Sequence, residues 1–195
     1  MSVRRVARVL GLGGTALAVG IAVSSGRAKD ADERAFRALN GVADPRVDRA
    51  ASAITEFGSI WASVGGALVL AASGRRRAAV KGIAAAGIAW LAGQGLKKLI
   101  ERPRPYQTDT EGTRLLVVPP RASSWPSSHP AVLLAFVDTV GRESGVPRIV
   151  RGALTGLAGA VGLSRVVVGV HYPADVAGGL LLGRAVATAV GFDGR

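Results

Sequence analysis

One segment of the sequence, residues 164–175, carries side chains suited to phosphate chemistry. It contains Arg165, His171 and Asp175 in that order. Because proline is common in the first turn of a helix, Pro173 predicts a helix that starts just after His171 and brings Asp175 close to the same face. The carboxylate can then hold one imidazole nitrogen and leave the other free to attack, while the arginine binds an anion. The segment therefore predicts a nucleophilic site for an oxyanion such as phosphate.

A second polar cluster occupies residues 97–105 and contains Lys97 and Arg104. Its two prolines end the preceding helix and hold the chain extended, so the lysine lies at a helix end and the arginine in a rigid loop. Taken alone, the cluster could be a basic boundary whose long side chains reach the membrane surface. Beside the first segment, it supplies two further cations for a phosphate.

A third cluster places Ser127, Ser128 and His129 in a small-residue turn before an apolar stretch. The free N–H groups at the start of the following helix could bind an anion. Taken alone, the turn could be only a serine cap. The three clusters together are better explained by one catalytic site than by a chance alignment of weak signals.

Composition favours one compact domain over residues 1–195, with the motif-bearing core at 97–175. The chain is 49% hydrophobic and its mean hydropathy is +0.33, which excludes a disordered chain. It has no cysteine, so neither a disulfide framework nor a thiolate metal site can form. The net charge of +12 fits nucleic acid, anionic lipid or an acidic substrate until the positions of the charges are considered.

Six apolar segments dominate the sequence, and most approach the roughly 20 residues that a helix needs to cross hydrocarbon. A soluble alanine-rich bundle is the alternative, but residues 60–73 carry no polar stripe at the helical period. We therefore expect an all-α integral membrane bundle of about six transmembrane helices. The segments lie at about 6–25, 53–74, 78–96, 130–148, 152–170 and 173–192.

The first apolar segment follows Arg4, Arg5 and Arg8 and so also resembles a signal peptide. No clear cleavage site with small residues follows it. We expect this segment to be retained as a membrane helix, because its removal would leave an odd number of spans and move one terminus across the membrane.

The distribution of basic residues predicts the orientation. If the helices alternate, one side of the membrane receives ten of them, and that side should be cytoplasmic. The three polar clusters then face the extracytoplasmic side of what we expect to be the cell membrane. Residues 27–49 carry six basic side chains on that outer side, which weakens the bias. Basic residues thus lie on both sides without an aromatic platform, which argues against nucleic-acid binding. The ten are Arg4, Arg5, Arg8, Arg75, Arg76, Arg77, Lys81, Arg142, Arg148 and Arg151.

The three clusters, KKLIERPRP, PSSH and SRVVVGVHYPAD, resemble the motifs of the type 2 phosphatidic acid phosphatases. This superfamily shares its site with vanadium haloperoxidases and bacterial nonspecific acid phosphatases. The resemblance implies that His171 is a nucleophile that forms a phosphohistidine, that Asp175 orients it and that His129 protonates the leaving oxygen. It implies that the phosphate is held by Lys97, Arg104, Arg165, Ser127, Ser128 and the backbone N–H groups after Pro126.

Ser128 departs from the commonest family pattern, which has glycine at this position. If the backbone must adopt a positive φ there, or approach the phosphate closely, serine fits less well. A small side chain reduces this difficulty.

The expected activity is metal-independent hydrolysis of a lipid phosphate or diphosphate monoester, with no cofactor. Three cations and two histidines can neutralise the phosphate, attack it and protonate the leaving group. Candidate substrates are isoprenyl phosphates or diphosphates, phosphatidate and phosphatidylglycerophosphate. A phosphotransferase that passes the phosphoryl group to a lipid or sugar hydroxyl is an alternative, and so is a catalytically silent lipid-binding protein. No sequence pattern indicates an oligomeric state.

Two charged residues are expected inside the membrane. Asp138 lies nine residues after His129, and Arg184 nine residues after Asp175, on helices that run inward from the same face. At 1.5 Å per residue, each lies about 13 Å below its motif residue. Because a charge at this depth is costly unless it is paired, we expect Asp138 and Arg184 to contact each other. Alternatively, Arg184 marks the cytoplasmic end of a short helix.

Overall fold

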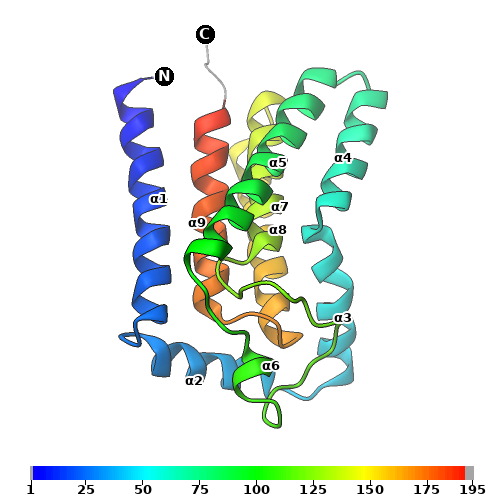
Figure 1. Cartoon of the computed structure of the whole chain (residues 1–195). Helices are drawn as coiled ribbons and strands as arrows, with labels where there is room; N and C mark the ends of the chain where they lie inside the picture. Colours follow the sequence, from blue (N-terminus) through cyan, green and yellow to red (C-terminus); the bar gives the residue numbers. More distant parts are fainter. Residues whose placement is uncertain (1, 192–195) are drawn as a thin grey trace.

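The computed structural model describes residues 2–191, in which helices and their connecting loops form a bundle (Figure 1). The described residues contain no strand, so the all-α prediction is confirmed. A single turn of 3₁₀ helix, η1 (Glu56–Gly58), lies between α3 and α4. The α-helices are α1 (Val3–Ser24), α2 (Lys29–Asn40), α3 (Pro45–Thr55), α4 (Ile60–Ala72), α5 (Arg76–Leu99), α6 (Pro105–Thr108), α7 (Ser128–Glu143), α8 (Arg148–Val167) and α9 (Pro173–Val190).

Helix α7 forms the centre of the bundle and packs against α5, α8 and α9. Most of its side chains are buried, including Ala131 and Ala135, which meet the alanines of α5. Small residues let the helices approach closely, as packing in lipid favours. A Cβ atom at Gly183 of α9 would lie 2.5 Å from the carbonyl oxygen of Ala131, so only glycine fits this contact. The tight core fixes the ends of α7 and α9, where the predicted site lies.

Large apolar side chains cover the outside of the bundle, as expected of helices that face lipid. Each of the six predicted segments contains a helix. By length and composition α1, α5 and α8 can cross a membrane, and the bent pair α3–α4 can supply a fourth span. The protein is an integral membrane protein. Its exposed apolar residues include Leu10, Leu17, Ile21, Trp61, Leu68, Val69, Val80, Ile88, Leu91, Ile149 and Leu163.

The prediction of one helix over 53–74 is wrong. Helix α3 begins at Pro45, and the chain bends by 63° between α3–η1 and α4. The hydroxyl group of Ser59 accepts a hydrogen bond from the backbone N–H of Ala62, which caps the start of α4. Gly58 at the bend faces the α7–α8 contact. The break therefore brings a corner of the chain toward the end of α7.

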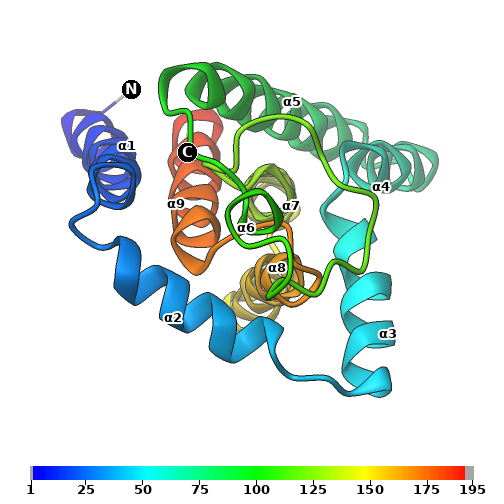
Figure 2. The same ribbon diagram turned by 60° about the horizontal axis from the view of Figure 1, so that its bottom comes forward.

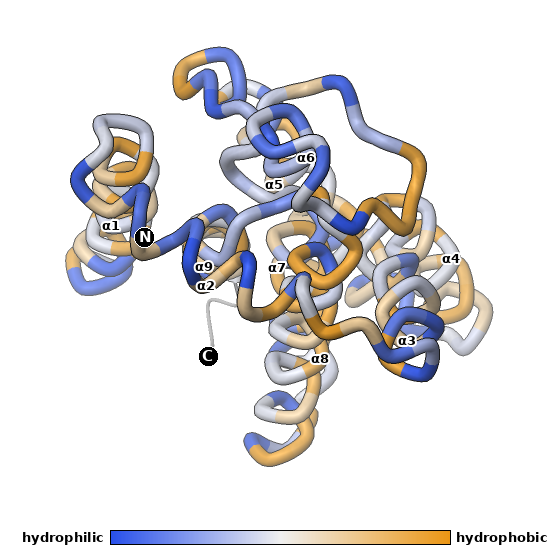
Figure 3. The backbone as a smooth tube through the Cα atoms, turned by 90° about the horizontal axis from the view of Figure 1, so that it is seen from below, coloured by the Kyte–Doolittle hydropathy of each residue, from blue (hydrophilic) through white to orange (hydrophobic). Residues whose placement is uncertain are grey.

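Residues 27–49, expected only as a charged outer stretch, form α2 and the start of α3. Helix α2 runs across one end of the bundle rather than along it (Figures 1 and 2). Its buried side chains, Asp32, Phe36 and Asn40, recur every four residues and so share one face. Figure 3 looks onto this end and shows hydrophilic residues concentrated in α2 and around α6. This amphipathic helix therefore covers the polar end of the bundle.

The opposite end of the bundle collects the basic residues that set the predicted orientation. A hollow of about 210 Å³ is lined by Arg4, Arg5, Arg8 and Arg142, together with Thr188 and Gly191. At the same end, Glu143 forms ion pairs with Arg77 at 2.6 Å and Lys81 at 2.8 Å. These basic residues therefore lie together at the end of the bundle opposite the predicted site.

The predicted contact between Asp138 and Arg184 is confirmed. Nη1 of Arg184 lies 2.9 Å from Oδ2 of Asp138, and Nη2 of Arg142 lies 2.9 Å from the same oxygen. The carboxylate is 3% exposed. Two arginines thus share one buried carboxylate, which satisfies a charge that would be costly alone in hydrocarbon.

Candidate active site

His171 is fixed by the turn between α8 and α9. After α8 ends at Val167, Gly169 adopts a φ of 87°, and a Cβ there would lie 2.2 Å from the carbonyl oxygen of Arg114, so the turn requires glycine. The backbone N–H of His171 donates to the carbonyl of Arg165 at 3.2 Å. His171 is 3% exposed. The imidazole is therefore held inside the end of the bundle.

Asp175 faces His171 from the first turn of α9, as the spacing predicts. Its Oδ2 lies 3.5 Å from Nδ1 of His171 and accepts a hydrogen bond from the backbone N–H of Tyr172 at 2.8 Å and another from the hydroxyl group of Ser124. Its Oδ1 accepts from Nη1 of Arg102 at 2.7 Å. These donors stabilise the ionised carboxylate in a fully buried position.

Arg104 lies against the other nitrogen of the histidine. Its Nη1 is 3.2 Å from Nε2 of His171 and donates to the carbonyl of Val170 at 2.7 Å. Burial lowers the pKa of His171 well below its ordinary value, because the effect of Asp175 does not outweigh desolvation and the Arg104 charge. The imidazole is therefore neutral at pH 7. An arginine at Nε2 and a carboxylate near Nδ1 together favour the tautomer with its proton on Nδ1.

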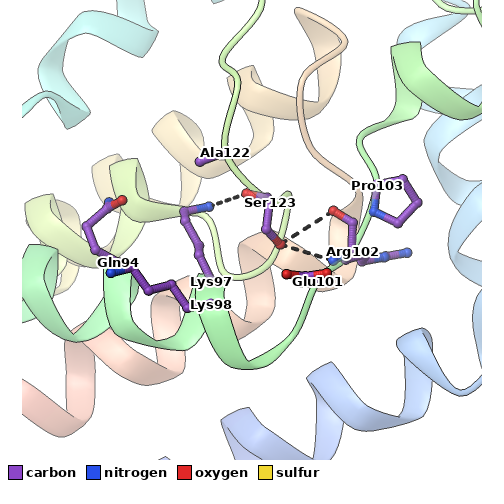
Figure 4. Close-up of a pocket in the computed structure, with 8 residues that line it drawn as sticks. All are labelled: Gln94, Lys97, Lys98, Glu101, Arg102, Pro103, Ala122 and Ser123. Carbon is purple, nitrogen blue, oxygen red and sulfur yellow. Dashed lines mark hydrogen bonds between the residues drawn. The ribbon is translucent and has the colours of Figure 1, made fainter.

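Lys97 and Arg165 bring two more cations to this end. Lys97 lies in the last turn of α5, and its Nζ donates to the carbonyl of Ser123 at 2.6 Å (Figure 4). Nη1 of Arg165 donates to the hydroxyl group of Thr55 at 2.7 Å, so the bend between α3 and α4 helps to hold this arginine. Nε of Arg165 is buried and has no hydrogen-bond partner among the described residues. A buried cationic N–H group of this kind can donate to a bound anion.

The start of α7 supplies further polar groups. The hydroxyl groups of Ser127 and Ser128 are buried without a partner among the described residues. The backbone N–H of Ser127, one of the N–H groups after Pro126, donates to the carbonyl of Asp175 at 2.9 Å. No described residue other than glycine has a positive φ. Ser128 therefore introduces no backbone strain where the family usually has glycine.

His129 lies in the first turn of α7, beside the bend in the α3–α4 chain. A Cβ at Gly58 would lie 2.6 Å from the Cβ of His129. The charges of Arg165, Arg104 and Lys97 act on its ring. The fold therefore brings all eight predicted residues, from the three separate clusters of the sequence, to one end of the bundle. Sequence analysis missed four contacting side chains, which are Asp32, Thr55, Arg102 and Ser124.

A cleft of about 540 Å³ opens beside this cluster (Figure 4). Lys97, Arg102 and Ser123 line it, and Ser123 lies between the two basic side chains. His171 is not among the lining residues, since its imidazole is buried next to Arg104. Among residues 2–191, no three His, Asp or Glu side chains lie together as a metal site would need. The cluster is built of cations and hydroxyl groups, which suits an oxyanion.

A comparison with protein families identifies the family to which this chain belongs. The sequence profile of the PAP2 superfamily matches residues 78–191, which include all the predicted site residues. The chain belongs to the PAP2 superfamily. The family region begins in α5 and ends after α9, so it contains the three motifs and the central helix that positions them.

Curated PAP2 relatives include bacterial phosphatases. The decaprenylphosphoryl-5-phosphoribose phosphatase of Mycobacterium tuberculosis is 37% identical over 95 residues, 49% of either chain. The chain therefore spans about half the length of that relative. The protein with the same name from Mycolicibacterium smegmatis is 33% identical over 138 residues, 69% of this chain and 72% of that one.

The fold is shared with a solved PAP2 structure. The transmembrane phosphatidylglycerolphosphate phosphatase of Bacillus subtilis superimposes with a TM-score of 0.77 and covers 94% of both chains at 24% identity. At this identity, the likeness shows the fold alone. It covers more of the chain than the profile match, which begins at residue 78.

Proposed function

We propose that this PAP2 protein hydrolyses a lipid phosphate or diphosphate monoester through a phosphohistidine. One observation carries the proposal: the buried His171 lies between a carboxylate and an arginine, 3.5 Å and 3.2 Å from its two nitrogens. Such an imidazole keeps its nucleophilic lone pair on Nε2 at neutral pH. The buried hydroxyl groups of Ser127 and Ser128 and Nε of Arg165, which lack protein partners among the described residues, can then donate to a phosphate.

In the first step, Nε2 of His171 attacks phosphorus, and the bond from phosphorus to the ester oxygen breaks. His129 donates a proton to the leaving oxygen, which departs as an alcohol or, from a diphosphate, as a lipid phosphate. Lys97, Arg104 and Arg165 neutralise the nonbridging oxygens as charge develops. The new phosphohistidine carries a positive imidazolium, whose Nδ1 proton faces the carboxylate of Asp175.

In the second step, water attacks phosphorus from the side that the leaving group vacated. His129, now neutral, accepts a proton from this water, and the bond from phosphorus to Nε2 breaks. Inorganic phosphate is released, and both histidines return to their starting protonation states. The atoms balance with water as the only second substrate.

We further propose that the substrate phosphate is presented at the extracytoplasmic surface of the cell membrane by a long lipid tail. One observation supports this side of the membrane, and a second supports the lipid tail. Four of the ten basic residues that the sequence assigns to one side, Arg4, Arg5, Arg8 and Arg142, line a hollow at the opposite end of the bundle, and the positive-inside rule assigns that end to the cytoplasm. The mycobacterial relatives are named for a decaprenyl-linked phosphoribose phosphate, so a polyprenyl carrier is the first substrate class to test.

Phosphate release from purified protein in detergent micelles tests the activity. A panel of polyprenyl phosphates, polyprenyl diphosphates, phosphatidate and phosphatidylglycerophosphate is supplied in the presence of a chelator. We expect release by the wild type and none by His171→Ala, while Asp30→Asn, which alters an exposed residue of α2, keeps the wild-type rate. Activity that disappears with the chelator contradicts the metal-free mechanism. Phosphoryl transfer to an added alcohol instead of water identifies a phosphotransferase, and no release from any substrate favours a silent lipid-binding protein.

A further inference from the structure

We propose that Asp32 and Arg102 are positioning residues, which hold the carboxylate of Asp175 in the orientation and charge state that the nucleophile His171 requires. The inference rests on the proposed function. Neither residue belongs to the set of phosphate-binding and catalytic side chains that the sequence predicts. They come from α2 and from the loop after α5, far from Asp175 in the sequence.

Arg102 binds two buried carboxylates with the two ends of its guanidinium fork. Nη1 lies 2.7 Å from Oδ1 of Asp175, and Nη2 lies 2.7 Å from Oδ2 of Asp32. The fork is stacked 4.1 Å from the centre of the Tyr172 ring, and the arginine side chain is 5% exposed. A planar fork held in this way fixes the rotation of the Asp175 carboxylate. With Oδ1 on Arg102, Oδ2 faces His171 at 3.5 Å while it also accepts from Ser124 and from the backbone N–H of Tyr172.

Asp32 also contacts the first turn of α9 directly, in addition to its contact with Arg102. Its Oδ1 accepts a hydrogen bond from the backbone N–H of Ala174 at 2.9 Å, while its Oδ2 holds Arg102. Ala174 immediately precedes Asp175 in the first turn of α9. One side chain of α2 therefore secures both the backbone beside the carboxylate and the arginine that binds the carboxylate.

The charges of this cluster explain why a second carboxylate is present. Arg102 alone would neutralise Asp175, and the carboxylate would then do little for a positive imidazolium on His171. With Asp32 included, the two carboxylates and one guanidinium carry a net charge of −1. Formation of the phosphohistidine adds the compensating positive charge. Asp32 thus preserves the ability of Asp175 to stabilise the intermediate.

Burial affects these groups in a consistent way. It raises the pKa of Asp32, while hydrogen bonds from Arg102 and Ala174 act in the opposite direction. Burial alone would lower the pKa of Arg102, but the two carboxylates outweigh it and raise that pKa. Arg102 therefore stays charged.

The kinetic test compares Asp32→Asn with Asp30→Asn, the same substitution at an exposed position of the same helix. We expect Asp32→Asn to lower kcat by roughly tenfold to a hundredfold, the loss typical when an outer group that orients a functional side chain is removed, as at metal-binding histidines. KM and the inhibition constant of inorganic phosphate should stay within about twofold, because the phosphate-binding cations are intact. Arg102→Lys should show the same pattern, since an ammonium keeps the charge but cannot bridge both carboxylates.

A merely structural role would give a different result. It would lower the thermal midpoint and raise the phosphate inhibition constant together with the loss of kcat, which overturns the proposal. Rates are therefore measured well below the unfolding midpoint of each variant. An unchanged kcat in Asp32→Asn overturns it equally.

A second measurement does not depend on catalysis. The chain has two histidines, so His129→Gln leaves His171 as the only imidazole, and ¹⁵N labelling of histidine then reports its Nδ1 directly. We expect Asp32→Asn to shift this resonance and Asp30→Asn to leave it in place. An unmoved resonance overturns the positioning role. If the wild type releases no phosphate from any substrate, the proposed function fails, and the resonance still tests the contact.

Discussion

Substitution of Gly58 by alanine tests the position of His129. A Cβ at this residue would lie 2.6 Å from the Cβ of His129 and 2.6 Å from Cγ1 of Val161, whereas ordinary contacts begin at 3.4 Å. The bend and the start of α7 must therefore separate by about 0.8 Å, the difference between these distances. Overpacking of this kind costs about 1–3 kcal/mol of stability. The φ of Gly58 is not positive, so the cost is steric and not conformational.

The effect on turnover should exceed the effect on folding. A displacement of about 1 Å at a reacting group can reduce the rate by roughly a hundredfold. We expect kcat for an alkyl phosphate to fall by about that factor in Gly58→Ala, with a smaller change in KM. Because His129 would protonate the leaving oxygen, the loss should shrink for p-nitrophenyl phosphate, whose leaving group needs little protonation.

Phosphate release from both substrates measures these effects, and thermal unfolding in the same detergent measures stability. The matched control is Gly65→Ala on α4, where a Cβ would meet nothing within 4 Å. This variant should keep full activity and be no less stable, since alanine in open helical space stabilises by about 0.4–1 kcal/mol. A Gly58→Ala enzyme with wild-type kcat, or an equal loss on both substrates, would refute the assignment of His129 as the acid.

Three further predictions concern the charged groups. In the single-histidine variant His129→Gln, ¹⁵N titration should show His171 neutral down to pH values well below 6.5, because burial depresses its pKa. The depressed pKa also means that folding stability falls as the pH drops below 6.5. A titration midpoint at 6.5 or above would contradict the buried geometry. Asp138→Asn should destabilise the protein by about 3–5 kcal/mol, and Arg184→Gln by less, because Arg142 still pairs with Asp138 in the second variant. Equal losses of stability in the two variants, measured by chemical unfolding, would argue against the shared carboxylate. Thr55→Val should raise KM by about tenfold, a loss of roughly 1.4 kcal/mol, by releasing Arg165, and an unchanged KM in steady-state assays would remove Thr55 from the site.

Local spacing was sufficient to predict the relation of His171 to Asp175 and the pairing of Asp138 with Arg184. In both cases the helical rise and period convert sequence positions into places on neighbouring helices. Arg102 was missed although it lies in the same motif as Arg104, because its partners are 70 and 73 residues away and no local pattern specifies them. The available signal was that Arg102 and Arg104 alternate along the same extended segment.

The bend between α3 and α4 and the course of α2 were missed for different reasons. The apolar run continues across Gly58, so hydropathy alone predicts one helix, although Ser59 is a typical N-cap residue. In α2, charged residues conceal the buried face formed by Asp32, Phe36 and Asn40. Their four-residue spacing predicts a helix, but the orientation of this helix across the end of the bundle depends on tertiary contacts.

The packing of α1 against α9 has a consequence for synthesis in the cell. Trp125 is fully buried between them, since a Cβ at Gly20 or at Gly178 would lie less than 3 Å from its ring. The end of α1 and the start of α9 are 149 positions apart, which at 5–20 residues per second separates their emergence from the ribosome by about 7–30 s. During this interval α1 lies in the lipid without α9, its main neighbour. Because the proposed nucleophile, His171, lies just before α9, the proposed site stays incomplete until α9 has been synthesised.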